Sequence, residues 1–101
     1  MKINFTQPLK TLDGTELKIE GKTRTTAQAV MDSLLFIFQD EANLPGEEKV
    51  KRYKLANRIY QSKCETDLTI EEAALIKKLT GKLFGPLIVG QIWSILEGLN
   101  Q

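Results

Sequence analysis

The sequence predicts a mainly helical α+β fold: an N-terminal β-hairpin over residues 2–19, then a compact four-helix body over residues 27–97. Alternating apolar and polar residues flank an Asp-Gly turn signal in the first segment. Further along, Thr69 and Glu72 have the spacing of a helix capping box. Apolar residues recur at helical spacing through most of the remaining chain, which favours helices packed around one core.

Length and composition indicate one globular domain, residues 1–101. The chain is 42% hydrophobic and 27% charged, which are ordinary values for a globular protein. Its net charge of +1 neither requires nor excludes a nucleic-acid partner. The single cysteine, Cys64, cannot form an internal disulfide, and residues 1–10 lack the apolar segment of a signal peptide. No membrane association is expected, and a reducing cytoplasm is the expected location.

The predicted hairpin places Ile3 and Phe5 on one strand and Leu17 and Ile19 on the other, with the turn at residues 13–14. Two strands by themselves are marginally stable in water. We therefore expect the hairpin to lie on the helices or to pair with a partner.

The first helix is predicted over about residues 27–40, with Thr25 or Thr26 as its cap. Phe36 and Ile37 fall off its main apolar face, so the helix is either buried on two sides or in contact with another subunit. The apolar face itself comprises Ala27, Val30, Met31, Leu34, Leu35 and Phe38.

The second helix is predicted over about residues 47–63. Its first turn should form favourable i,i+4 pairs, Glu47 with Lys51 and Glu48 with Arg52. The predicted buried stripe comprises Val50, Tyr53, Ala56, Ile59 and Tyr60.

Two helices complete the body, over residues 70–84 and from Pro86 onward. Pro86 suits the first turn of a helix. The last helix is apolar nearly all round, which predicts that it is the central and most buried one, with Trp93 inside the core. The glycines at positions 81, 85 and 90 are interpreted as permitting close helix packing and a bend.

No arrangement of residues points to catalysis, a cofactor or a metal. The chain has no histidine, which removes the commonest general base and the commonest zinc ligand. The adjacent acid pairs at residues 40–41, 47–48 and 71–72 lie in loops or at helix starts, where negative charge favours the helix dipole. We therefore expect a protein that is not an enzyme.

A basic face on the second helix is the one candidate for phosphate contact. Lys51, Lys54 and Arg58 share this face. The alternative is a solvated face neutralised by Glu47 and Glu48.

Three stretches carry a resemblance to a known family: MKINFTQPLKTLDGTEL, LPGEEKVKRYKLANRIY and DLTIEEAALIKKLTGKLFGPLIVGQIWSILEG. The chain resembles small proteins of tailed phages and prophages that have a short hairpin start and a helical remainder. The resemblance implies a phage-derived protein that acts in the cytoplasm of a bacterial host.

The sequence is consistent with two functions. The first is a non-enzymatic protein-interaction module that binds a phage assembly component or a host protein. The alternative is a small nucleic-acid-associated regulator that uses the basic face. Surplus apolar residues, namely Phe36, Ile37 and Leu99, are the candidate interface and predict a two-fold homodimer; the other reading is a monomer whose surface awaits a different protein.

Overall fold

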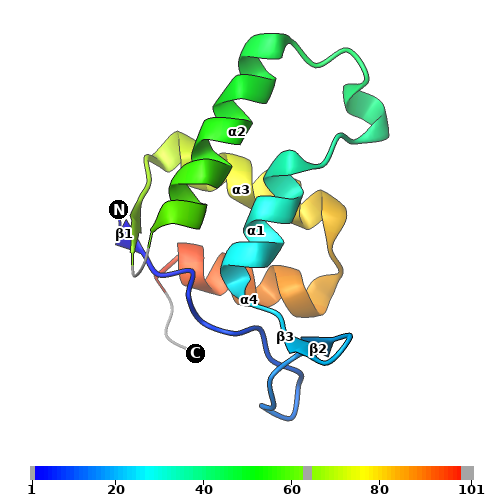
Figure 1. Cartoon of the computed structure of the whole chain (residues 1–101), viewed down its shortest axis with the longest axis vertical. Coiled ribbons are helices and arrows are strands. Elements are labelled where there is room, and N and C mark those ends of the chain that lie inside the picture. The colour runs from blue at the N-terminus through cyan, green and yellow to red at the C-terminus, as the bar shows by residue number, and fades with distance from the viewer. Residues whose placement is uncertain (1, 63–64, 99–101) are drawn as a thin grey trace.

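The computed structural model describes residues 2–62 and 65–98 (Figure 1). It confirms the predicted fold class, a mainly helical α+β fold with an N-terminal hairpin and four α-helices. The helices are α1 (Thr26–Leu35), α2 (Gly46–Gln61), α3 (Ile70–Leu83) and α4 (Pro86–Leu96). A short 3-10 helix, η1 (Gln39–Glu41), lies between α1 and α2.

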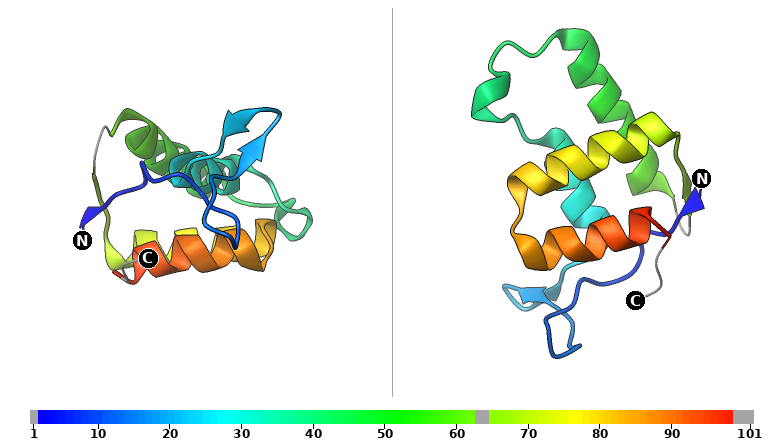
Figure 2. Two further views of the ribbon diagram at one scale, coloured as in Figure 1. Left: turned by 90° about the horizontal axis from the view of Figure 1, so that it is seen from below. Right: turned by 180° about the vertical axis from the view of Figure 1, so that it is seen from behind.

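The four helices form two layers, with α1 and α2 in one and α3 and α4 in the other (Figure 2). Helix α1 contacts both α2 and α3, and α4 packs on α3. The centre of the molecule is therefore the contact between α1 and α3. The fully buried side chains of the core include Val30 of α1, Ile76 and Leu79 of α3, and Ile92 of α4.

The prediction that the last helix is the most buried is wrong. In α4 only Ile92 and Leu96 are buried, and Trp93 remains 38% exposed. Trp93 lies over the outside of α3, where its indole N–H donates to the carbonyl oxygen of Lys77 at 3.2 Å. The sequence is apolar around the whole helix, but α4 sits at the edge of the second layer and one face is enough to attach it to the core.

The predicted strand pairing within residues 2–19 also differs. Strand β1 (Lys2–Ile3) pairs antiparallel with β4 (Thr66–Asp67), which precedes α3. The two-stranded hairpin consists instead of β2 (Lys18–Ile19) and β3 (Lys22–Thr23). Alternation of apolar residues identifies a strand without identifying its partner, and β1 finds its partner more than sixty residues away.

The turn predicted at residues 13–14 is present. Gly14 has a φ of +90°, a conformation that glycine adopts without a steric penalty. The Thr11 N–H donates to the Thr15 carbonyl oxygen at 2.8 Å, and the Leu17 N–H donates to the Leu9 carbonyl oxygen at 2.8 Å. This turn is one of two reversals of the chain before α1, because the β2–β3 hairpin follows it directly (Figure 1).

Both predicted helix caps are present. Thr69 and Glu72 form the capping box, with the Thr69 hydroxyl accepting from the Glu72 N–H at 3.1 Å and the Glu72 carboxylate accepting from the Thr69 N–H at 2.9 Å. Thr25 caps α1 in the same way with Gln28. Pro86 occupies the first turn of α4.

Helix α1 ends at Leu35, five residues before the predicted end. Phe36 adopts an extended conformation, and the chain turns away from the helix axis. Phe38 is nevertheless buried, since the connecting segment folds back and places it in the core. Phe36 and Ile37 are exposed because the helix has already ended, not because they lie on its second face.

The predicted buried stripe of α2 is only partly correct. Ala56 and Ile59 are buried, but Val50, Tyr53 and Tyr60 are exposed. The face that α2 turns toward the core comprises Arg52, Leu55, Ala56 and Ile59. The contact with α1 selects this face, and a buried arginine, which apolar periodicity does not anticipate, belongs to it.

Candidate interaction surface

The outer side of α2 carries an apolar row that the core does not use. Val50, Tyr53 and Tyr60 are 50%, 60% and 74% exposed. Together with Asn57 they are spaced three, four and three residues apart, the spacing of the a and d positions of a coiled-coil heptad. We call Val50, Tyr53, Asn57 and Tyr60 the α2 seam.

Apolar side chains of helix α1 lie beside the α2 seam. Leu35, in the last turn of α1, is 57% exposed, and Met31 one turn earlier is half-buried. A hollow of about 220 Å³ lies between the two helices. Its lining comprises Met31, Leu35, Tyr53, Ala56, Asn57 and Tyr60. Two neighbouring helices thus present one apolar hollow to solvent.

Charges of both signs lie beside the seam, since Glu47 is exposed one heptad before Lys54 and lines a surface hollow with Val50, Lys51 and Lys54. Lys49 and Lys54 are both exposed, and they occupy the two positions that flank a heptad seam. Among the residues that the structure describes, neither lysine forms an ion pair. The only charged residue of α1, Asp32, is bonded to Arg24. The lining of the hollow itself contains no charged side chain, and the one α1 carboxylate is paired with Arg24.

The segment between α1 and α2 is held at one end of this surface by two ion pairs. Arg52 binds Glu41 with both terminal nitrogens of its guanidinium fork; Arg52 is buried and the Glu41 side chain is only 10% exposed. Lys82 of α3 binds Asp40 at 2.9 Å and also lies 4.6 Å from the ring centre of Phe38. The hydrogen bonds from Arg52 lower the pKa of Glu41 to about 2. The ion pairs therefore fix the position of the segment that follows Leu35.

The residues predicted as an interface divide into two groups. Phe36 and Ile37 are 48% and 50% exposed, next in the chain to Leu35, and the Phe36 ring meets the buried Phe38 ring edge to face. Leu99, the third predicted interface residue, lies outside the described residues. Apolar periodicity predicts Tyr53 and Tyr60 in the core, but the structure leaves both exposed. Their heptad spacing, beside a second apolar set at Leu55, Ala56 and Ile59, is the signal that could have placed them outside.

The structure pairs much of the basic face of α2 with carboxylates. Arg58 binds Glu72 of α3 at 2.6 Å, and Lys51 lies 3.7 Å from Glu48. Lys54 is the member beside the seam. A phosphate stripe built from Lys51, Lys54 and Arg58 would therefore compete with the capping carboxylate of α3 and with Glu48.

The shifted carboxylates have structural causes. The Thr11 and Thr15 hydroxyls and the Thr15 N–H hydrogen-bond Asp13 in its turn and lower its pKa to about 2. Burial alone would raise the pKa of Glu72, but hydrogen bonds from Thr69 and Arg58 outweigh it and lower the pKa. In Asp13, Glu72 and Glu41 alike, the hydrogen bonds that lower the pKa stabilise the charged carboxylate in a turn, a cap or an ion pair.

Residues 2–62 and 65–98 contain neither a metal-binding cluster nor a helix able to span a membrane. No group of cysteine, aspartate or glutamate side chains there is arranged to hold a metal ion. None of the helices in that part of the chain is both long enough and apolar enough to cross a membrane.

Comparison with known proteins returned no match. No protein-family model, no curated protein and no solved structure matches the chain.

Proposed function

We propose that this chain is a non-enzymatic protein-interaction module, encoded by a phage or prophage, that binds a phage assembly component or a host protein in the bacterial cytoplasm. The observation that carries the interaction role is the α2 seam. Tyr53 and Tyr60 are large, rigid and exposed on a helix, and tyrosine is enriched at the energetic centres of protein interfaces. The phage origin and the cytoplasmic location rest on the sequence resemblance.

The polar residues around the α2 seam support a binding site as the explanation for its exposed apolar side chains. A contiguous apolar surface rimmed by polar groups is typical of a binding site. Here the lysines flank the seam, and Asn57 within it offers an amide that can bond to a partner.

The proposal is tested by affinity capture from host cells and from infected cells, followed by mass spectrometry, with two matched variants. Tyr53→Glu places a carboxylate in the seam. Leu12→Glu places the same charge on an exposed apolar residue at the tip of the N-terminal turn, which is 96% exposed. We expect at least one protein to be captured by the native chain and by Leu12→Glu but not by Tyr53→Glu.

Circular dichroism checks that both variants are folded. The proposal is overturned if the captured proteins are the same for all three chains. The positions of neighbouring genes provide an independent test, since a tail or head cluster supports an assembly partner and an early regulatory block supports the nucleic-acid alternative.

A further inference from the structure

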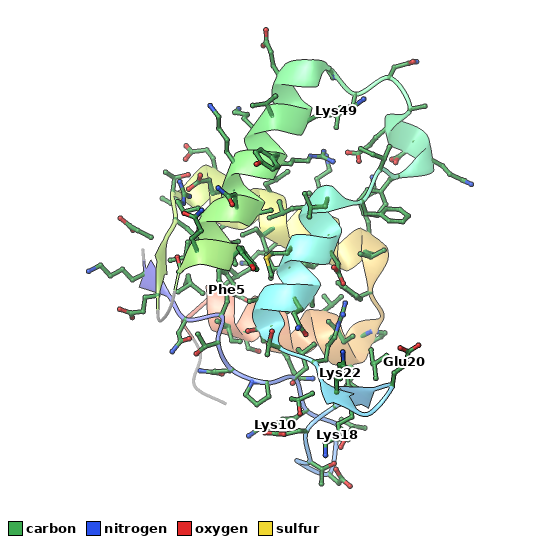
Figure 3. All side chains as sticks on the ribbon, viewed as in Figure 1. Phe5, Lys10, Lys18, Glu20, Lys22 and Lys49 are labelled. Carbon is green, nitrogen blue, oxygen red and sulfur yellow. The ribbon has the colours of Figure 1, made fainter. Side chains whose placement is uncertain are left out.

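The segment between α1 and α2, residues 36–45, is attached to the rest of the fold mainly through side chains. We call it the connector; it lies at the end of the molecule remote from Lys18 and Lys22 of the hairpin (Figure 3). Phe38 is its only buried residue. Among the described residues, no backbone hydrogen bond joins positions 37–44 to an α-helix or a strand. A segment with so few buried apolar contacts and backbone bonds opens at a lower free energy than the core.

Two neighbouring carboxylates of the connector bind helices of different layers. Asp40 binds Lys82 of α3 at 2.9 Å, and Glu41 binds Arg52 of α2 with both of its oxygens. Phe38 is close to the same lysine, whose ammonium lies 4.6 Å from the ring centre. These three attachments fall within residues 38–41, so a backbone movement that releases one of them displaces the others. We therefore expect them to be released together.

The closed position of the connector leaves one buried donor without a partner. The Arg52 side chain is only 5% exposed, and its Nε has no hydrogen-bond partner among the described residues. A buried donor without a partner raises the free energy of the state that contains it. Opening the connector admits water to the guanidinium and relieves this cost, which lowers the free energy of opening.

We propose that the connector is a latch: residues 36–45 open as one unit while the four helices stay folded, and opening releases Phe38 from the core. The latch controls an apolar run. Phe36 and Ile37 are about half exposed in the closed state, whereas Phe38 is 8% exposed. Opening makes all three consecutive side chains accessible, so the closed connector is an autoinhibitory contact on this run. The inference is independent of the α2 seam and of the partner that the seam binds.

Native-state hydrogen exchange of the full isotope-labelled chain, followed by NMR, tests the latch. The Glu41 and Leu44 N–H groups are the connector reporters, because they donate at 2.9 Å to carbonyl oxygens within the connector. The N–H of Leu79, a fully buried residue of α3, reports on the core. We expect the connector reporters to share one opening constant, at least about a hundredfold larger than that of Leu79 and less dependent on urea.

A core variant separates opening of the connector from unfolding of the whole chain. Phe5 is buried and lies across the molecule from the connector (Figure 3). Phe5→Leu should speed exchange at Leu79 about tenfold, because it weakens the core. The connector reporters should keep their native rates, since the contacts of Phe5 persist when only the connector opens.

A matched pair of variants tests what holds the latch closed. Glu41→Gln removes the charge that binds Arg52 and should speed exchange at Leu44 about tenfold or more, after correction for intrinsic rates. Leu79 should speed by the same factor, because the ion pair is absent from the open and the unfolded states alike. Glu48→Gln makes the same chemical change at the exposed pair with Lys51, which opening leaves intact, and should leave Leu44 unchanged.

The latch is overturned if Phe5→Leu speeds the connector reporters as much as it speeds Leu79, because the connector would then open only when the whole chain unfolds. Different opening constants for Glu41 and Leu44 would also overturn it, since they would show separate fraying of single bonds. Exchange of both at the rate of an unstructured chain would show that no closed state exists. If Glu41→Gln does not fold, the native chain and Phe5→Leu still decide the outcome.

Discussion

Arg52 and Glu41 form a buried, two-pronged ion pair that joins α2 to the segment between α1 and α2. Nη1 donates to Oε1 at 2.8 Å and Nη2 donates to Oε2 at 2.6 Å, with side chains only 5% and 10% exposed. The expected partner of Arg52 was Glu48, four residues earlier on the same helix. Pairing with Glu41 turns Arg52 inward, so that the opposite side of α2, with its tyrosines, faces solvent.

Breaking this ion pair should destabilise the protein strongly. Arg52→Met or Glu41→Leu alone should lower the free energy of unfolding by about 3 kcal/mol, because each leaves a buried charge without its partner. The double variant should cost less than the sum of the single ones, since neither charge remains. Urea denaturation gives all three values. Glu48→Ala, at the exposed pair with Lys51, is the control and should cost under about 0.5 kcal/mol.

The same pair predicts a pH dependence of stability. The pKa of Glu41 is about 2 in the folded chain and 4.5 for the unperturbed side chain. Between these values the unfolded state binds more protons, so the contribution of Glu41 is fully present above about pH 4.5 and is lost as the pH falls toward about 2. The difference in unfolding free energy between the native chain and Glu41→Gln should shrink over this range. A constant difference from pH 5 to about pH 2 would contradict the assignment.

The position of α4 predicts unequal costs for two neighbouring residues. Ile92 is fully buried, so Ile92→Ala should cost about 2–5 kcal/mol. Trp93 is partly exposed on the outside of α3, and Trp93→Ala should cost less, about 1–2 kcal/mol. Denaturant melts of the two variants measure the order. A larger loss of unfolding free energy for Trp93→Ala than for Ile92→Ala would show that α4 is the central helix, as the sequence predicts.

Nucleic-acid binding should be absent at physiological salt. Glu72 and Glu48 lie against Arg58 and Lys51, so few cations on α2 remain for phosphates. We expect no gel shift with double- or single-stranded DNA. A shift that weakens steeply with salt, and that disappears when Lys51, Lys54 and Arg58 are replaced by glutamate, would favour the regulator instead.

The predicted two-fold dimer should form through Phe36 and Ile37 rather than through the α2 seam. Both side chains are about half exposed and follow directly on the end of α1, whereas the seam is proposed to bind another protein. Light scattering coupled to gel filtration at micromolar concentration gives the mass. The predicted two-fold dimer should fall to a monomer with Phe36→Asp and persist with Tyr53→Glu. A monomer mass for the native chain would reject the dimer.

The sequence by itself determined the features that depend on neighbours a few residues apart. The Thr69–Glu72 capping box, the cap at Thr25, the turn at Gly14 and the break before Pro86 all appear where local spacing predicted them. Each involves groups within about one helical turn, so the chemistry of the residues is enough to specify them. The number and order of the helices followed from the same signals.

Tertiary structure decided which apolar face of each helix became the core. Helix α2 carries one apolar set at Leu55, Ala56 and Ile59 and another at Val50, Tyr53 and Tyr60, and periodicity does not rank them. Contact with α1 and the pair with Glu41 turn the first set inward. In the same way β1 pairs with β4, far along the chain, and α4 lies at the edge of its layer. Which face of a helix becomes buried depends on which segments meet in space. The candidate interaction surface is the apolar face of α2 that these contacts leave exposed.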